Sequence, residues 1–149
     1  MGVQSIKIIR AGTFAGRAGA CYVRIQAMAV KHHITLDREF DEFDTPETMY
    51  LVALDDVLPV ATCRLVPADK TSMTLGRIVV LPEYRRHGLG SRVVMEAERW
   101  AAELGYRSVV LESRVNKRVF YEKLGYEACS GQIIHGDTFD CMRMKKLLG

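Results

Sequence analysis

The sequence predicts a mixed α/β domain in which a mostly antiparallel sheet is flanked by helices. Apolar, β-branched runs separated by short turns predict an antiparallel meander over residues 49–81. Residues 73–112 then read as strand, helix and buried strand, which predicts a right-handed parallel crossover within the same sheet. The expected order of elements is therefore β-α-β-β-β-α-β-α-β.

Length and composition predict one domain over residues 1–149. A chain of 149 residues can bury one substantial core, and 48% hydrophobic with 26% charged residues is ordinary for a soluble globular protein. The net charge of +3 is too small to indicate nucleic-acid binding, and no apolar run is long enough to span a membrane. We expect a cytoplasmic protein that binds neither nucleic acid nor membrane, while a homodimer stays open.

The cysteines and histidines do not indicate a disulfide framework or a metal site. The four cysteines, Cys21, Cys63, Cys129 and Cys141, stand far apart and form no C-x-x-C pair. They are typical of reduced, mostly buried residues in a cytoplasmic protein. His32 and His33 are adjacent, with no ligand cluster at suitable spacing, so we expect no zinc site.

The first 44 residues predict a strand, a helix and a polar loop. Residues 5–10 form the strand, and a helix capped by Thr13 continues to about residue 30, with Gly16 and Gly19 weakening it or delaying its start. Residues 37–44 contain five acids among eight residues. Such a run is usually a solvated loop, which we expect here. The alternative is an acidic wall that attracts a cationic amine.

The remaining elements follow from apolar periodicity and turn residues. Strands are expected at residues 49–54, 60–66, 73–81, 108–112 and 140–145, with turns at 55–59 and 68–72 and a loop at 130–138. Helices are expected at 91–104, ended by Gly105, and at 115–124, ended by Gly125. The strand at 108–112 reads as buried because its centre, Val-Val-Leu, is wholly apolar.

The segment Leu-Pro-Glu-Tyr-Arg-Arg-His-Gly-Leu-Gly at residues 81–90 joins a predicted strand to a predicted helix. Gly88 and Gly90 allow the backbone to come close to a ligand, and the first N–H groups of a helix favour anions. Arg85 and Arg86 add positive charge, so the segment suits a pyrophosphate. A plain connector is the alternative. A P-loop lacks its Gly-Lys-Ser/Thr here, and a dinucleotide fingerprint would need glycine at position 93, which is Val.

Two motifs resemble those of the GNAT acetyltransferases. The first is Arg-Arg-His-Gly-Leu-Gly at residues 85–90, which follows Val-Leu-Pro at 80–82 and matches the Arg/Gln-x-x-Gly-x-Gly/Ala coenzyme A loop. The second is Phe-Tyr-Glu-Lys-Leu-Gly-Tyr at 120–126. The sequence is similar to the ElaA-like and YjcF-like branch through Arg24, residues 36–44, residues 59–65 and Gly76-Arg77. It departs from that branch at Lys31-His32 and at residues 136–139, which end in Phe139, both around the expected acceptor site.

The resemblance implies the GNAT acyl-CoA N-acyltransferase fold, with a splayed parallel strand pair at the centre of the sheet. It implies acetyl-CoA as cofactor and transfer of the acetyl group to the primary amine of a small molecule within a ternary complex. Tyr121 would protonate the leaving sulfur. Contacts with pantetheine, acetyl and pyrophosphate would come from Ile78, Val79, Val80, Arg85, Arg86, His87, Gly88, Leu89, Gly90 and Ser91, with Asn116 as a further candidate.

Several alternatives stay open at this point. Tyr121 could be a core residue of its helix, and Asn116 a polar residue that merely begins that helix. No general base is identifiable, because Glu112 is a weak candidate and a chain of waters could serve instead. The function alternative to an enzyme is a non-catalytic acyl-CoA-binding or sensing module of the same fold.

Overall fold

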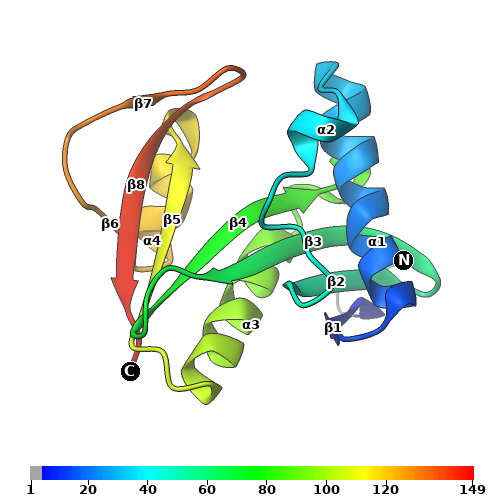
Figure 1. The fold of residues 1–149 in the computed structure, drawn as a ribbon, viewed down its shortest axis with the longest axis horizontal. Helices are drawn as coiled ribbons and strands as arrows, with labels where there is room; N and C mark the ends of the chain where they lie inside the picture. The colour runs from blue at the N-terminus through cyan, green and yellow to red at the C-terminus, as the bar shows by residue number, and fades with distance from the viewer. Residues whose placement is uncertain (1–4) are drawn as a thin grey trace. The chain divides into compact units, whose positions relative to one another are not determined.

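The strands form one eight-stranded sheet in the order β1-β2-β3-β4-β5-β8-β6, with β7 paired to β8 (Figure 1). The structure is a computed structural model and describes residues 5–149. The chain divides into two units. The N-terminal unit holds residues up to 66 together with 77–97, and the C-terminal unit holds 67–76 and 98–149. Strand β4 (Ser72–Val80) and helix α3 (Leu89–Glu103) contribute residues to both.

The N-terminal unit is built on an antiparallel meander. Strand β1 pairs with β2, and β2 pairs with β3, both antiparallel. Its other elements are two helices, a π-helix and a 3-10 turn. The bounds are β1 (Lys7–Ala11), α1 (Phe14–Arg24), the π-helix η2 (Ile25–Val30), α2 (Leu36–Glu39), β2 (Met49–Asp55), β3 (Leu58–Pro67) and η3 (Pro82–Tyr84).

Helix α1 begins where the sequence predicts it and packs on β1 and β2 (Figure 1). The Thr13 side chain accepts a hydrogen bond from the Gly16 N–H at 3.1 Å, which confirms the predicted N-cap. The glycines do not delay the start of this helix, because α1 begins at Phe14 directly after Thr13. A Cβ at Gly16 would lie 2.8 Å from Ala11 Cβ, and one at Gly19 would lie 3.3 Å from Pro59 and Val52 side-chain atoms. Glycine is therefore what lets the helix approach the sheet.

One apolar cluster of the core lies on this meander. Ala11, Ala20, Tyr50 and Val52 are buried together, and Ile9 and Leu54 pack against them. Three predicted boundaries of this region change. The helix expected to continue to residue 30 becomes a π-helix at Ile25, the hairpin turn shortens to residues 56–57, and residues 36–39 form α2 within the expected loop.

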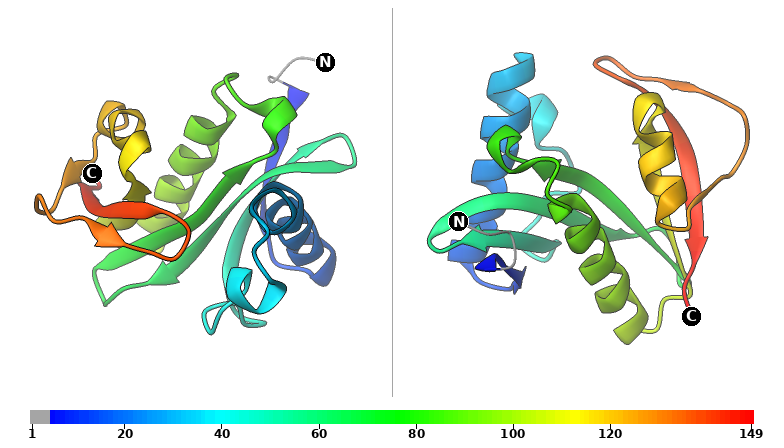
Figure 2. Two further views of the ribbon diagram at one scale, coloured as in Figure 1. Left: turned by 90° about the horizontal axis from the view of Figure 1, so that it is seen from above. Right: turned by 180° about the vertical axis from the view of Figure 1, so that it is seen from behind.

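The C-terminal unit pairs the crossover strand with the last strand of the chain. Strand β5 (Ser108–Arg114) pairs antiparallel with β8 (Asp140–Leu147) over its whole length, and β6 (Glu127–Ala128) and β7 (Ile134–His135) also pair with β8. Helix α4 (Arg118–Lys123) packs on β5 (Figure 2). The helix expected at 115–124 begins instead as the 3-10 turn η4 (Val115–Lys117), and the sequence did not reveal β6 or β7.

The parallel pair at the centre of the predicted sheet is confirmed. Strand β4 pairs parallel with β5 from Ser72–Ser108 to Leu75–Leu111, and β4 continues to Val80 beyond that ladder. Residues 108–111 are buried, as their apolar pattern predicts. Gly105 and Gly125 adopt positive φ angles of 93° and 101° just past helices α3 and α4, which is how a glycine ends a helix.

The cysteines are free thiols, as the sequence predicts, but the prediction that they are mostly buried is wrong. Only Cys63 is buried; Cys21 and Cys141 are partly exposed and Cys129 is exposed. Over residues 5–149, no three His, Cys, Asp or Glu side chains gather in a group that could hold a metal ion. None of the helices in that part of the chain has both the length and the apolar character to cross a membrane.

Candidate functional site

The loop between β4 and α3 is anchored at both ends and exposed between them. At its start, the Leu81 N–H donates to the Val60 carbonyl at 2.8 Å, and the 3-10 turn η3 follows. At its end, Leu89 is buried and begins α3, two residues earlier than predicted. Residues 85–88 between these anchors are exposed. Of the residues predicted to cradle a pyrophosphate, positions 89–91 therefore belong to the first turn of a helix.

Two residues of this loop adopt left-handed backbone conformations. Arg86 has φ 67° and Gly88 has φ 78°. A Cβ placed on Gly88 would meet no heavy atom within 4 Å, so this glycine faces open space and not a packed core. The backbone at residue 88 is thus accessible directly before the N-terminus of α3, where the first helical N–H groups lack intrahelical partners. An anion could approach the main chain here.

The side chains of the loop are positively charged and exposed. The Arg85 Nε donates to the carbonyl of Val80, the last residue of β4, at 3.1 Å. Arg86 forms no ion pair with any carboxylate in the part of the chain that the structure describes. His87 is also exposed. The loop therefore presents a cationic surface beside the open backbone of Gly88.

A hydrogen bond that sequence reasoning missed fixes the turn before this loop. The Tyr84 hydroxyl donates to Asp55 Oδ2 at 2.5 Å, and Asp55, at the end of β2, is 9% exposed. The hydrogen bond to Asp55 raises the pKa of Tyr84. No sequence signal links positions 55 and 84, because the contact depends on the hairpin end and the turn meeting in space.

Strand β4 carries the residues predicted to contact pantetheine. Val79 is buried, whereas Ile78 and Val80 are half-buried. Directly before them, Arg77 has φ 47°, a left-handed conformation inside a strand. That φ departs from the extended conformation of a strand. The three predicted contact residues therefore follow a local irregularity of the strand.

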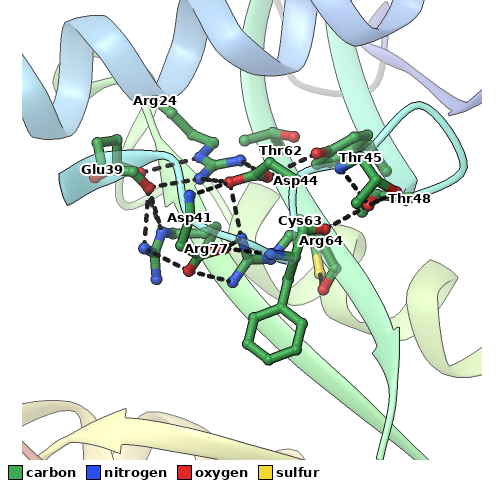
Figure 3. A network of polar contacts seen from close by, with 12 residues as sticks. Arg24, Glu39, Asp41, Asp44, Thr45, Thr48, Thr62, Cys63, Arg64 and Arg77 are labelled. Carbon is green, nitrogen blue, oxygen red and sulfur yellow. Dashed lines mark hydrogen bonds and ion pairs between the residues drawn. The ribbon is translucent and has the colours of Figure 1, made fainter. Parts of the chain in front are cut away.

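Arg77 belongs to a network of buried and partly buried ion pairs (Figure 3). Arg24, at the end of α1, has a side chain that is 1% exposed. Its Nε donates to Glu39 Oε2 at 3.0 Å, and its Nη1 donates to Asp44 Oδ1 at 2.7 Å. Arg64 on β3 donates through Nη1 to Asp41 Oδ1 at 2.8 Å and to Asp44 Oδ2 at 3.0 Å.

The prediction of a solvated acidic loop at residues 37–44 is wrong for three of its five acids. Glu39 is buried, and Asp41 and Asp44 are partly buried. Burial would raise the pKa of Asp44, but hydrogen bonds from Arg24, Tyr50 and the Asp41 N–H hold it well below its usual range. Three arginines balance these three carboxylates, so the three add no excess negative charge, whereas Asp37 and Glu42 are exposed.

Tyr121 and Asn116 both belong to the C-terminal unit. The Tyr121 side chain is buried at 9% exposure, and its ring meets those of Phe120 and Tyr126 edge-on, with centroids 4.9 Å and 5.9 Å apart. Asn116 is exposed in the 3-10 turn η4, ahead of α4. Glu112, the weak candidate for a general base, is exposed on β5.

The residues that depart from the ElaA-like pattern occupy two different settings. Lys31 is exposed and His32 is half-buried just after the π-helix η2. Phe139 lies between β7 and β8, where the Arg114 guanidinium carbon is 3.6 Å from its ring centroid. That cation–π contact holds the aromatic ring against the end of β5.

The loop at 85–91 fits a coenzyme A pyrophosphate. The group is a dianionic diphosphate, and the loop offers an accessible backbone at Gly88, the start of a 15-residue helix and the exposed guanidinium of Arg86. The sequence already indicated this group of glycines and arginines, because such residues at a strand–helix junction are recognisable from their spacing.

Comparison with known proteins shows the family. Residues 20–126 match the acetyltransferase (GNAT) family. A provisionally named acetyltransferase of Bacillus subtilis is 37% identical over 98 residues, which are 64% of this chain and 66% of that protein.

Solved structures share the fold. A provisionally named N-acetyltransferase from Lactobacillus plantarum is 32% identical and has a TM-score of 0.91, with 97% of this chain and 99% of that chain covered. Escherichia coli ElaA (14% identical, TM-score 0.81, 95% and 98% covered) is similar in fold. So is a GNAT acetyltransferase from Elizabethkingia anophelis with acetyl-CoA bound (17%, 0.71, 97% and 99%). The family match covers more than half of the sequence, and this chain belongs to the GNAT acetyltransferase family.

Proposed function

We propose that this chain is an acetyl-CoA-dependent N-acetyltransferase that acetylates the primary amine of a small molecule within a ternary complex. The observation that carries the proposal is the loop at 85–91, where left-handed Arg86 and Gly88 expose the backbone before α3. Membership of the family and the acetyl-CoA bound to the Elizabethkingia anophelis structure support the choice of cofactor.

The proposed roles divide between binding and proton transfer. Arg85, Arg86, His87, Gly88, Leu89, Gly90 and Ser91 would hold the pyrophosphate, and Ile78, Val79 and Val80 would line pantetheine and acetyl, with Asn116 as a further contact. Bound acetyl-CoA supplies an acyl group activated as a thioester. Holding that group against an amine can lower the barrier by about 7–11 kcal/mol.

Tyr121 is the proposed general acid. A phenol near the sulfur can give the leaving thiolate its proton, a contribution of about 10²–10⁴ in rate. Its burial between two aromatic rings, Phe120 and Tyr126, limits the orientations of its own ring. That restriction is what a positioned acid needs, although a core tyrosine would be restricted in the same way.

A non-catalytic acyl-CoA-binding module is the second candidate. The observation that favours it is the pairing of Glu39, Asp41 and Asp44 with Arg24, Arg64 and Arg77. These paired acids offer no excess negative charge to a cationic acceptor. The departures at Lys31-His32 and Phe139 point the same way.

A thiol-release screen separates the two candidates. The purified chain is mixed with acetyl-CoA and a panel of small primary amines, including amines that carry a carboxylate or a phosphate, and free coenzyme A is measured with a thiol reagent. Amine-dependent thiol release supports the enzyme. Acetyl-CoA binding by calorimetry without release for any amine supports the binding module, and absence of binding contradicts both.

A further inference from the structure

Arg77 holds a backbone conformation that its side-chain type disfavours. Its φ of 47° lies in the left-handed region, which is uncommon for residues other than glycine, asparagine and aspartate. The residue sits inside β4, two positions after the last pair of the β4–β5 ladder and directly before Ile78. Something other than local preference must therefore stabilise this conformation.

The guanidinium of Arg77 supplies that stabilisation. Its Nε and Nη2 both donate to the Glu39 carbonyl, at 3.2 Å and 2.9 Å, and Nη2 also donates to Asp41 Oδ2 at 3.2 Å. Its Nε also lies 3.2 Å from Glu39 Oε2. Figure 3 shows the side chain directed toward Glu39 and Asp41. These hydrogen bonds connect β4 to Glu39 at the end of α2. They are made by Arg77, the one residue among positions 72–80 with a left-handed conformation.

Glu39 does not need Arg77 to satisfy its own buried groups. Arg24 already donates to the Glu39 carboxylate at 3.0 Å through Nε and to its carbonyl at 2.8 Å through Nη2. The Arg77 side chain is 29% exposed, whereas that of Arg24 is 1% exposed. The contacts of Arg77 are therefore not needed to satisfy Glu39. Their effect is on the backbone conformation of β4.

We propose that Arg77 is a positioning residue for the strand that lines the cofactor: its guanidinium holds the left-handed residue and so sets which way Ile78, Val79 and Val80 face. Side chains alternate along a strand, so relaxing residue 77 to an extended conformation would shift the register and turn each following residue to the other face. This inference rests on the proposed function for its consequence in binding, but its structural part concerns the chain alone.

Two substitutions at this one position separate the guanidinium from the backbone. In Arg77→Ala the guanidinium is lost while a Cβ remains, so the left-handed conformation is strained and unsupported. In Arg77→Gly the guanidinium is also lost, but glycine adopts positive φ without penalty. We expect acetyl-CoA affinity, measured by calorimetry, to fall at least about tenfold in Arg77→Ala and to stay within about threefold in Arg77→Gly.

Amide hydrogen exchange on the ligand-free chain gives a second readout. The amides of residues 78–80 should change their protection in Arg77→Ala and keep it in Arg77→Gly. Arg10→Ala, which removes an arginine that pairs with Glu96 at 3.1 Å in the same unit, is the matched control and should alter neither readout.

The rescue by glycine is the decisive outcome. Equal exchange behaviour of the alanine and glycine variants, whether both change or neither does, would overturn the proposal. If the unmodified chain fails to bind acetyl-CoA, the proposed function fails, and the exchange comparison still decides whether Arg77 positions the strand.

Discussion

Two arginine-rich regions of the N-terminal unit differ in what surrounds their guanidinium groups. In the network, Arg24, Arg64 and Arg77 meet three carboxylates, and Arg24 is wholly buried. In the loop, Arg85 and Arg86 are exposed, and Arg86 meets no carboxylate in the described part of the chain. The same side chain is thus a structural cross-link in one region and a charge available to a ligand in the other.

The difference has an energetic reason. A buried guanidinium loses its hydration, and paired, hydrogen-bonded carboxylates must offset that loss. An exposed guanidinium keeps its water and contributes little to stability, so the fold neither requires it nor is harmed by it. We therefore expect substitution of the buried Arg24 to change stability and substitution of the exposed Arg86 to change binding.

Arg24→Ala should have the largest effect on stability. It removes four hydrogen bonds to Glu39 and Asp44 and takes the buried positive charge away from these two carboxylates. Breaking a buried pair from one side costs about 3–5 kcal/mol, which chemical denaturation would measure. The control is Arg118→Ala, which breaks an exposed pair with Glu122 at 3.0 Å and should cost less than about 0.5 kcal/mol. Similar losses in both variants would erase the distinction between the two settings.

Tyr121→Phe extends the comparison to tyrosines. If its hydroxyl protonates the leaving thiolate, turnover should fall about 100-fold with little change in acetyl-CoA affinity. Tyr126 is the matched control, because its hydroxyl donates to Glu98 at 2.8 Å within the same unit. Tyr126→Phe should lower the thermal midpoint and leave turnover largely intact. Unchanged turnover in Tyr121→Phe would make Tyr121 a core residue.

Arg86→Ala should weaken binding without weakening the fold. We expect the affinity for acetyl-CoA to fall about tenfold, since one charge-assisted hydrogen bond contributes about 1.5–3 kcal/mol. A pantetheine fragment, which has no pyrophosphate, serves as the internal control and should bind the variant and the parent equally. Calorimetry with both ligands makes the test. Equal losses for both ligands would mean that Arg86 shapes the loop and does not contact phosphate.

The smallest expected effect is a pH dependence within the network. Burial and the hydrogen bond to Asp44 raise the pKa of Tyr50 from 10.0 to about 12. The Tyr50 hydroxyl ionises less readily in the folded chain than in the unfolded chain. Its contribution to the free energy of unfolding is therefore complete below pH 10 and is lost as the pH rises through about 12. At pH 11 the loss should be about 1 kcal/mol.

Comparison with Tyr50→Phe isolates this contribution, because other groups also titrate at high pH. Urea denaturation at pH 8 and pH 11 should give a smaller decrease in unfolding free energy for Tyr50→Phe than for the parent chain. An equal decrease in the two chains would show that the hydrogen bond of 2.7 Å between Tyr50 and Asp44 does not couple to titration.

The elements of the fold were predictable where local patterns determine them. Thr13 as N-cap, the strands of the meander and the glycine stops at 105 and 125 all follow from propensities within a few residues. Gly16 and Gly19 misled because their role is tertiary: propensity treats glycine as a helix weakener, whereas here it permits close packing on β1 and β2.

The sequence predicted the loop at 85–91 but not the ion-pair network of Arg24, Arg64 and Arg77. The loop is one continuous segment, so its glycines and arginines could be recognised together. The network joins α1, α2, β3 and β4, and the acids at 39–44 read as a solvated run because nothing local shows that Arg24, Arg64 and Arg77 lie beside them. Long-range pairing of charges depends on topology, which the run itself does not encode.

Calorimetry of acetyl-CoA with Gly88→Val and Gly105→Val tests the central claim most directly. Both glycines have positive φ, and a Cβ on either would meet no heavy atom within 4 Å, so valine strains the two backbones alike. If the loop at 85–91 binds the pyrophosphate through its backbone, Gly88→Val should abolish measurable binding while Gly105→Val binds as the parent does. Retained binding in a folded Gly88→Val variant would contradict the assignment of this loop as the coenzyme A site.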